Sequence, residues 1–184
     1  MVKLLIAGPK QAGKTSIANF LSDSSRAKIG DAGAPYEPTA GCRILEFDAS
    51  NGASVELWDV SGDQQYESCW PAITQGVTSL GAPSSTSPVD GVILVYNPEF
   101  PTHDTEVGLW YDAFVKNCDL PDSKCLVFTH RGDPKGGFRS RPPPKLEGCV
   151  VHNTTFSSTM EIREHFENFL QGAVGGGGGG MRRK

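Results

Sequence analysis

A glycine-rich segment near the start of the chain carries side chains that are suited to bind phosphate. Residues 8–15 read GPKQAGKT and match the pattern GxxxxGK followed by Ser or Thr at every fixed position. Gly8 and Gly13 allow backbone N–H groups to point toward phosphate oxygens, beside the positive end of the following helix. Lys14 would contact the β- and γ-phosphates, and the Thr15 hydroxyl would bind Mg²⁺. The alternative is a glycine-rich turn whose Lys14 is only solvated.

Two further segments supply polar groups that could complete a nucleotide site. Asp59 stands at the end of a predicted strand, where its carboxylate would hold a magnesium-bound water, and the Gly62 amide could meet the γ-phosphate. Between this segment and the phosphate loop lie residues 36–41, which read YEPTAG. The candidate binding residues of the phosphate loop and of the segment that contains Asp59 are Gly8, Pro9, Lys10, Gln11, Ala12, Gly13, Lys14, Thr15, Asp59 and Gly62.

The elements that would position these residues alternate between strands and helices. Apolar runs predict strands at 2–7, 42–48, 54–59, 91–97, 124–129 and 149–152. Apolar residues at helical spacing predict helices that begin near Thr15, Val107 and Ser158. Asn51-Gly52 is a strong hairpin signal between the second and third strands. This order predicts an α/β fold of five or six strands, with a mainly parallel central sheet and helices on both faces. The phosphate loop would lie at the carboxyl edge of the first strand.

Three stretches fall outside this alternation. The chain of 184 residues is expected to hold one domain, which we place at 1–171. Residues 78–88 are of low complexity and are expected to form a surface loop. Consecutive prolines at 142–144 argue against an α-helix over 136–148. Residues 172–184 form a glycine-rich tail with a basic end, which we expect to act as a flexible tether.

Composition and charge argue against several classes of protein. The chain has 17 basic and 21 acidic side chains and a formal net charge of -4, so it lacks a general attraction for nucleic acid or anionic lipid. Its apolar runs are too short to span a bilayer. The sequence has no cysteine after Cys149, so we expect no C-terminal prenylation. Five cysteines without a CxxC pair predict reduced thiols. We therefore expect a soluble intracellular protein with no nucleic-acid partner and no direct membrane anchor.

Taken together, the phosphate loop, the YEPTAG segment and the following WDVSG segment resemble those of a Ras-superfamily small GTPase of the Rab type, over residues 1–171. The resemblance implies the P-loop small-GTPase fold, with GTP or GDP and Mg²⁺ as ligands. It implies that Thr39 senses the γ-phosphate and Mg²⁺ and that Tyr36 lies over the nucleotide. Thr15, Thr39 and, through water, Asp59 would hold the metal.

The base-recognition motif of this family is altered in the chain. In place of Asn-Lys-x-Asp after the fifth strand stand His130, Arg131, Gly132 and Asp133. The Asp133 carboxylate could accept two hydrogen bonds from guanine, and Arg131 could stack its stem over the base. His130 replaces an asparagine that braces the phosphate loop, which predicts a looser pocket. The alternative for Asp133 is an exposed loop carboxylate with no role in binding.

Four longer strings resemble one atypical branch of this family, intraflagellar transport protein 22, also called Rab-like protein 5. They are ANFL at 18–21, YEPTAGCRILEF at 36–47, ELWDVSGDQQYESCWPA at 56–72 and WYDAF at 110–114. The resemblance implies a small GTP-binding subunit of the intraflagellar transport B particle, with long coiled-coil subunits of that particle as partners. It also implies a location in the cilium or flagellum and in the basal-body cytoplasm.

Two positions near the expected γ-phosphate depart from the usual small GTPase. The residue after Gly62 is Asp63 in place of the glutamine that orients the attacking water, and Gln64 follows one position later. Lys10 stands where a glycine usually leaves room for an arginine finger. Neither Asp63 nor Gln64 is assigned as a catalytic residue, although both lie near the expected water position. We therefore expect GTP hydrolysis to be slow or absent.

Three hypotheses for the function remain open. In the first, bound nucleotide orders the Thr39 and Gly62 segments, which then present a surface to partners. Candidates for that surface are Phe47, Trp58, Tyr66 and Trp70. In the second, the protein is a slow GTPase switch that needs a helper protein, and in the third it is a scaffold that no longer depends on nucleotide. An ATP-using P-loop protein is a further alternative, against which Asp133 and the Rab-like strings argue.

Overall fold

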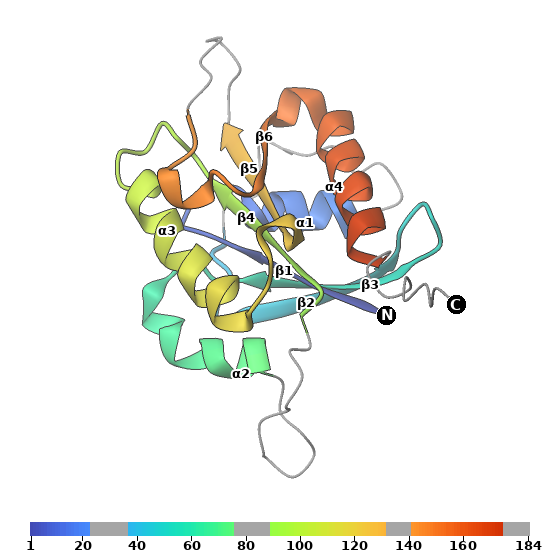
Figure 1. Cartoon of the computed structure of the whole chain (residues 1–184), viewed down its shortest axis with the longest axis horizontal. Helices are drawn as coiled ribbons and strands as arrows, with labels where there is room; N and C mark the ends of the chain where they lie inside the picture. Colours follow the sequence, from blue (N-terminus) through green and yellow to red (C-terminus); the bar gives the residue numbers. More distant parts are fainter. Residues whose placement is uncertain (23–36, 76–88, 132–140, 175–184) are drawn as a thin grey trace, which may run out of the picture.

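Strands and helices alternate along the chain as the apolar pattern predicts. The computed structural model describes residues 1–22, 37–75, 89–131 and 141–174 (Figure 1). Its strands are β1 (Val2–Ala7), β2 (Cys42–Asp48), β3 (Ser54–Val60), β4 (Gly91–Tyr96), β5 (Cys125–Arg131) and β6 (Val150–Thr155). Its α-helices are α1 (Lys14–Ser22), α2 (Trp70–Gln75), α3 (His103–Phe114) and α4 (Thr159–Val174). Short 3-10 helices are η1 (Gln64–Cys69), η2 (Lys116–Cys118), η3 (Asp122–Lys124), η4 (Pro144–Leu146) and η5 (Phe156–Ser158).

The described strands form one six-stranded sheet in the order β2-β3-β1-β4-β5-β6 (Figure 1). β1 pairs in parallel with β3 and β4, and β5 pairs in parallel with β4 and β6. β2 is antiparallel to β3. A parallel strand at the centre of a sheet is covered on both faces, which is why the residues at positions 4–7 of β1 are all apolar and fully buried. The predicted α/β fold with a mainly parallel sheet is confirmed.

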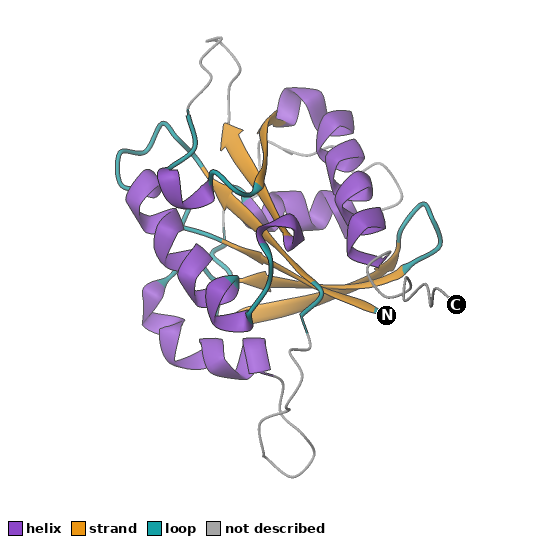
Figure 2. Cartoon of the chain, viewed as in Figure 1, coloured by secondary structure: helices purple, strands orange, loops and turns teal. Residues whose placement is uncertain are grey.

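Different helices cover the two faces of the sheet (Figure 2). On one face, Leu4 of β1 belongs to a core with Ile17 of α1 and Phe166 of α4. On the other face, Leu5 belongs to a core with Trp110 of α3. The neighbours Leu4 and Leu5 enter different cores because successive side chains of a strand point to opposite faces. The prediction of helices on both faces is therefore confirmed.

The β2–β3 hairpin turns at Asn51-Gly52, as predicted. Gly52 has a positive φ of 81°, and its N–H donates to the Ala49 carbonyl at 2.9 Å. The register that follows from this turn places Arg43 of β2 opposite Asp59 of β3. Because one residue of slip would turn every β2 side chain to the other face, the turn decides which of them can reach Asp59.

Some boundaries lie further along the chain than the sequence indicates. β5 continues to Arg131 and β6 to Thr155, past the expected ends at 129 and 152, because the two strands pair in parallel over this whole length. His130 and Arg131 are therefore strand residues and not part of the loop that follows. The last helix continues to Val174, beyond residue 171, where we expected the domain to end.

The proline-rich segment has little regular structure where it is described. Residues 141–148 contain the 3-10 helix η4 and no α-helix, in agreement with the expectation from the three prolines. The low-complexity residues 78–88 and the tail from 175 to 184 lie outside the described residues. Among the described helices, none combines the length and the apolar character needed to cross a bilayer.

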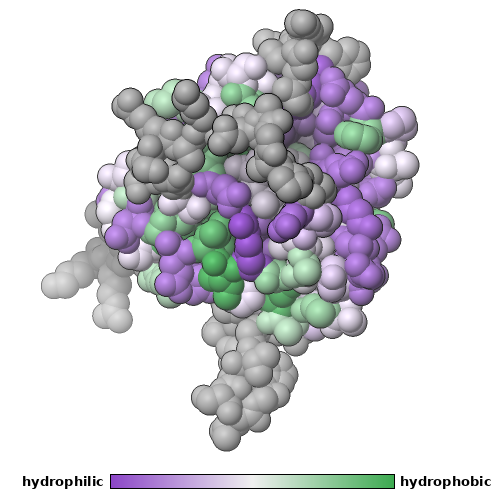
Figure 3. Space-filling model, turned by 180° about the vertical axis from the view of Figure 1, so that it is seen from behind, coloured by the Kyte–Doolittle hydropathy of each residue, from purple (hydrophilic) through white to green (hydrophobic). Residues whose placement is uncertain are grey.

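The face opposite to that of Figure 1 is largely hydrophilic, and hydrophobic residues form only limited patches on it (Figure 3). The large apolar side chains that are exposed on the described surface include Met1, Ile44, Phe100, Leu109, Val150 and Met160. Two of the aromatic candidates for a partner surface also contact the cores. The Trp70 ring lies 4.7 Å from the ring of Trp110 and 5.1 Å from that of Phe114, and the Phe47 ring lies 6.1 Å from that of Phe166. Both residues are partly buried, and their role in partner binding remains a prediction.

Candidate functional site

The phosphate loop joins β1 to α1, in the predicted order of strand, loop and helix. Gly8 and Gly13 have φ angles of 140° and 93°, which residues with a Cβ rarely adopt. A Cβ on Gly8 would also collide with the Val95 carbonyl of β4. Gln11 has a positive φ of 58° although it carries a side chain, so the loop is tightly wound here. These angles wrap the backbone around the start of α1.

Lys14 is the buried cation of the site. Its side chain is only 6% exposed, and Nζ donates to the Pro9 carbonyl of the same loop at 2.6 Å. Burial lowers the pKa of Lys14 to about 8, while the nearby negative charge of Asp59 acts in the opposite direction. A phosphate group beside the ammonium would favour its charged form further. The geometry thus agrees with the predicted role of Lys14 as a phosphate ligand.

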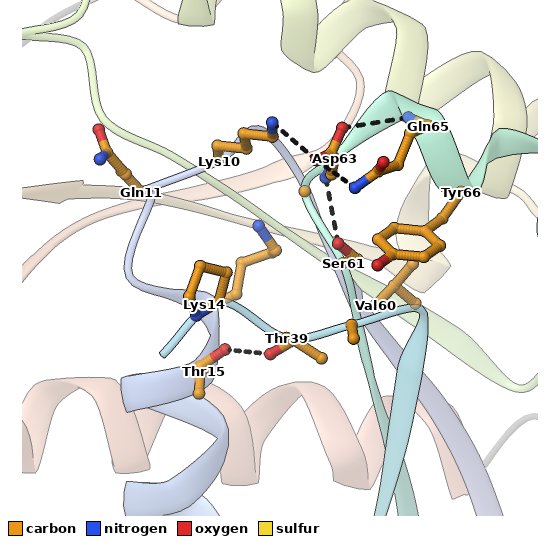
Figure 4. A pocket seen from close by; sticks show the side chains of 13 residues that line it. Lys10, Gln11, Lys14, Thr15, Thr39, Val60, Ser61, Asp63, Gln65 and Tyr66 are labelled. Carbon is orange, nitrogen blue, oxygen red and sulfur yellow. Dashed lines mark hydrogen bonds and ion pairs between the residues drawn. The ribbon is translucent and has the colours of Figure 1, made fainter. Parts of the chain in front are cut away.

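The Asp59 carboxylate collects side chains from three separate segments. It is fully buried at the end of β3, and Oδ2 accepts hydrogen bonds from the Thr15 hydroxyl at 2.9 Å and the Thr39 hydroxyl at 3.2 Å. The two hydroxyl oxygens lie 2.8 Å apart (Figure 4). Oδ2 also accepts from Arg43 Nε at 3.1 Å. The structure therefore brings together all three residues predicted to hold a metal.

One oxygen of this carboxylate has no hydrogen-bond partner among the described residues. Asp59 Oδ1 is buried, and a buried unpaired carboxylate oxygen is costly unless another group, such as an ion or water, meets it. Two hydroxyls and a carboxylate are the hard oxygen donors that Mg²⁺ prefers. The residues present therefore fit a magnesium ion, and the division into direct and water-mediated ligands remains a prediction.

Sequence analysis missed Arg43, which touches Asp59 from β2. Its Nη2 also donates to Asn19 Oδ1 of α1 at 2.6 Å, so this one side chain links β2, β3 and α1. Counting residues back and forward from the Asn51-Gly52 turn would have placed Arg43 opposite Asp59. The signal was present in the sequence but required the hairpin register.

A cavity of about 290 Å³ lies between the phosphate loop and the segments that contain Thr39 and Gly62 (Figure 4). It is lined by Lys10, Gln11, Lys14, Thr15, Pro38, Thr39, Ala40, Val60, Ser61, Gly62, Asp63, Gln65 and Tyr66. Gly62 packs closely on the phosphate loop, because a Cβ there would lie 2.6 Å from both the Lys10 backbone nitrogen and Lys14 Nζ. Gln64 is exposed and does not line the cavity, whereas Gln65 does.

Lys10 and Asp63, which sequence analysis treated as separate departures, form an ion pair. Lys10 Nζ lies 2.8 Å from Asp63 Oδ2 (Figure 4). The Asp63 carboxylate also accepts from Gln65 N at 3.1 Å and Gln65 Nε2 at 2.7 Å. The hydrogen bonds from Lys10 and Gln65 hold the pKa of the Asp63 carboxyl below its usual value. Asp63 is therefore ionised and already engaged by neighbouring donors.

His130 packs directly against the phosphate loop, and the predicted looser pocket remains a prediction. A Cβ on Gly13 would lie 2.7 Å from His130 Cδ2, and the ring is only 3% exposed. His130 Nδ1 lies 3.0 Å from the Thr154 hydroxyl, and the Phe156 ring meets the imidazole edge-on at 4.2 Å. Burial lowers the pKa of His130 to about 4, so the ring is neutral near pH 7. The ring fills the space beside Gly13 because an imidazole is larger than the asparagine amide it replaces.

The remaining predicted base-side residues are only partly within the described structure. Arg131 is half-buried at the end of β5, next to Thr155 of β6. Gly132 and Asp133 lie outside the described residues, as does Tyr36 on the phosphate side. The predicted roles of Arg131, Asp133 and Tyr36 remain predictions.

Comparison with known proteins agrees with this fold and site. No family model matches the chain. The chain is 36% identical over 180 residues to the intraflagellar transport protein 22 homolog of Danio rerio, a match that covers 92% of this chain and 88% of the relative. It is 36% identical over 185 residues to the homolog of Homo sapiens, covering 94% of this chain and 89% of the relative.

Solved structures give the same result. The GDP-bound crystal structure of intraflagellar transport protein 22 from T. brucei superposes with a TM-score of 0.70 at 26% identity, covering 95% of this chain and 97% of that one. A likeness of this extent supports the small-GTPase fold, and the identity with the curated relatives extends over nearly the whole chain. The chain therefore belongs to the intraflagellar transport protein 22 family of Rab-like small GTPases.

Proposed function

We propose that this chain is a Rab-like guanine-nucleotide-binding subunit of the intraflagellar transport B particle. One observation carries this proposal: the Thr15 and Thr39 hydroxyls both meet the buried carboxylate of Asp59, beside Lys14. Each of these residues comes from a different segment, and each is of the type that a small GTPase requires at that place. The T. brucei relative has been solved with GDP bound, which supports a guanine nucleotide as the ligand.

The phosphate loop and Lys14 would hold the phosphates, and a magnesium ion would neutralise part of their charge. Thr15 and Thr39 would donate oxygen ligands to that ion, and Asp59 would hold one of its waters. Gly62 already lies against the phosphate loop, so its amide is close to the region that a γ-phosphate would occupy. We propose that bound nucleotide orders the Thr39 and Gly62 segments for partner binding.

Hydrolysis of GTP by this site is proposed to be slow or absent. A carboxylate can only accept hydrogen bonds, whereas the usual glutamine both donates and accepts. Asp63 is moreover occupied by Lys10 and Gln65, and Gln64 faces solvent outside the cavity. No side chain that we assign to the site is thus in place to orient the attacking water.

Guanine is the proposed base, bound by Asp133 with Arg131 stacked above it. This part of the proposal rests on the family resemblance and on Arg131 lying at the carboxyl end of β5, from which the following loop departs. Tyr36 would lie over the nucleotide. An adenine nucleotide would leave the Asp133 carboxylate without its two donors.

The proposed partners are coiled-coil subunits of the particle. A further solved structure, of T. brucei intraflagellar transport proteins 22, 74 and 81 with GTP bound, matches this chain with a TM-score of 0.68 at 26% identity. It covers 95% of this chain and 97% of the matched one. By extension, we propose that this chain binds the corresponding subunits and lies with them in the cilium or flagellum and the basal-body cytoplasm. It would take that location from its partners.

The decisive experiment identifies the nucleotide. Purified protein would be denatured, and the released nucleotide separated by chromatography, with titrations of GDP and ADP on the emptied protein. We expect guanine nucleotide, and loss of GDP binding in Lys14→Ala but not in Lys145→Ala, since Lys145 is half-exposed on η4. Adenine nucleotide would favour the ATP-using alternative. Absence of any nucleotide binding, with partner binding retained, would establish the scaffold alternative.

A further inference from the structure

An ion pair joins the phosphate loop to the segment that follows Gly62. Lys10 Nζ and Asp63 Oδ2 lie 2.8 Å apart and both side chains line the cavity (Figure 4). The backbones of the two segments are also in contact, because a Cβ on Gly62 would lie 2.6 Å from the Lys10 nitrogen. The pair therefore closes one wall of the cavity in which a γ-phosphate would lie.

The two partners of this pair differ in how firmly they are held. Asp63 caps η1, and its carboxylate accepts from the backbone and the side chain of Gln65. The Lys10 side chain is 62% exposed, against 27% for Asp63. A long, exposed lysine side chain can change its rotamer at little cost, whereas the capping carboxylate cannot move without uncapping η1. Lys10 is thus the partner that can move.

Two other charges beside the cavity are buried and have different partners. Lys14 is buried and donates to the Pro9 carbonyl, and Asp59 accepts from Arg43. Lys10 therefore differs from Lys14, because Lys10 pairs with the acidic side chain of Asp63 whereas Lys14 donates to a backbone carbonyl. A terminal phosphate carries close to two negative charges near pH 7 and attracts an ammonium more strongly than one carboxylate does. The same phosphate is repelled by Asp63.

We propose that Lys10 and Asp63 form an opposed pair that sets the preference of this site for GTP over GDP. Lys10 leaves Asp63 for the γ-phosphate when GTP binds and stays on Asp63 when GDP binds. Lys10 thus favours the triphosphate, and Asp63 opposes it by holding Lys10 and by its own charge. This inference rests on the proposed guanine-nucleotide site and assigns to it the residues that distinguish the two nucleotides.

A double-mutant cycle tests the pair. The unchanged protein, Lys10→Met, Asp63→Asn and the double variant would each be titrated with GDP and with a non-hydrolysable GTP analogue in the presence of Mg²⁺. The quantity of interest is the ratio of the two dissociation constants. We expect Lys10→Met to lower the preference for the analogue about tenfold, which corresponds to about 1.4 kcal/mol, and Asp63→Asn to raise it about threefold to tenfold.

The cycle also separates a pair from two independent charges. Asp63→Asn should raise the preference more when Lys10 is present than in the Lys10→Met background, because only then does it release a cation for the phosphate. All of these effects should shrink in about 1 M salt, since Lys10 is largely exposed. Strictly additive effects of the two substitutions would contradict the opposed pair.

The chain offers a matched control in a second lysine–aspartate ion pair. Lys145 and Asp112 form it on the surface, joining η4 to α3 away from the cavity lining. Lys145→Met and Asp112→Asn should leave the ratio unchanged. If the unchanged protein binds GDP and the analogue but the ratio does not respond to Lys10→Met or Asp63→Asn, the inference is wrong and the proposed function stands. If the unchanged protein binds no guanine nucleotide, both are wrong.

Discussion

The phosphate side and the base side of the candidate site are built from different kinds of contact. On the phosphate side, hydroxyls and charges from the phosphate loop, β2, β3 and the Thr39 segment meet at Asp59, whose second oxygen has no partner among the described residues. On the base side, a neutral His130 ring is wedged between Gly13 and Phe156. The first region is built mainly from polar and charged contacts, whereas the second is built mainly from ring packing.

This difference indicates where nucleotide and metal should matter for stability. Lys14 is a buried ammonium that donates to a neutral carbonyl, and the buried Asp59 carboxylate keeps one oxygen without a hydrogen-bond partner among the described residues, although Arg43 pairs with the other. Bound phosphate and Mg²⁺ should therefore stabilise the phosphate side strongly. The His130 ring is uncharged, so it needs no counter-ion, although its buried Nε2 also lacks a hydrogen-bond partner among the described residues. The effects of substitutions on the phosphate side should therefore depend on Mg²⁺. The effects of substitutions on the base side should depend on the identity of the base and on pH.

The largest expected effect is on the phosphate side. Asp59→Asn should weaken binding of a GTP analogue about a hundredfold in the presence of Mg²⁺, because a residue that holds a metal-bound water typically contributes 10–100-fold to metal affinity. With a chelator present, the variant and the unchanged protein should bind with similar affinity. Titrations with and without Mg²⁺ would measure this, with Asp112→Asn as the charge-matched control. An unchanged dependence on Mg²⁺ would show that Asp59 does not serve the metal.

A smaller effect is expected from the base side. Asp133→Ala should weaken GTP binding at least about tenfold, since it removes two hydrogen bonds to a charged acceptor, each worth about 1.5–3 kcal/mol. The loss should be the same with and without Mg²⁺, which is what separates the two sides. Calorimetric titration would measure it. Equal affinity of the variant and the unchanged protein would make Asp133 an ordinary loop carboxylate.

The buried His130 should make the free energy of unfolding depend on pH. The unfolded chain protonates His130 near its ordinary pKa of 6.5, whereas the folded chain resists protonation until about pH 4. The free energy of unfolding should therefore be unaffected by this group above pH 6.5 and fall as the pH drops from 6.5 toward 4, by about 1.4 kcal/mol per unit.

His130→Asn should remove this dependence. Between pH 7.5 and pH 5.5, the free energy of unfolding should fall by about 1 kcal/mol less in this variant than in the unchanged protein. Denaturant unfolding of both proteins at the same series of pH values would measure the two slopes. The same slope in His130→Asn and in the unchanged protein would mean that the ring is not protected from protonation.

The smallest effect concerns turnover. Asp63→Gln alone should change single-turnover GTP hydrolysis by less than about threefold, since the new side chain still lies beside Lys10. Asp63→Gln with Lys10→Gly should restore more, because it also opens the space that an external arginine finger would need. Rapid hydrolysis by the unchanged protein would refute this prediction and favour the hypothesis that the protein is a true enzyme.

Local sequence was sufficient wherever the controlling interactions are local. The wrapped phosphate loop follows from Gly8 and Gly13, whose positive φ angles only glycine adopts easily, and from the helix that starts beside them. The Asn51-Gly52 turn and the buried runs of β1, β4 and β5 were predicted for the same reason. The convergence of Thr15, Thr39 and Asp59 was predicted through the family resemblance.

Tertiary structure decided the contacts that join distant segments. Arg43 reaches Asp59 only through the hairpin register, Lys10 meets Asp63 only because Gly62 packs on the phosphate loop, and His130 covers Gly13 only because β5 and β6 pair beyond their apolar runs. The residues next to a charged or aromatic side chain in the sequence do not specify its long-range partner. Its position in the sequence therefore does not reveal which distant group it will contact. The packing of the sheet and helices selects that partner, and with it the charge balance of the site.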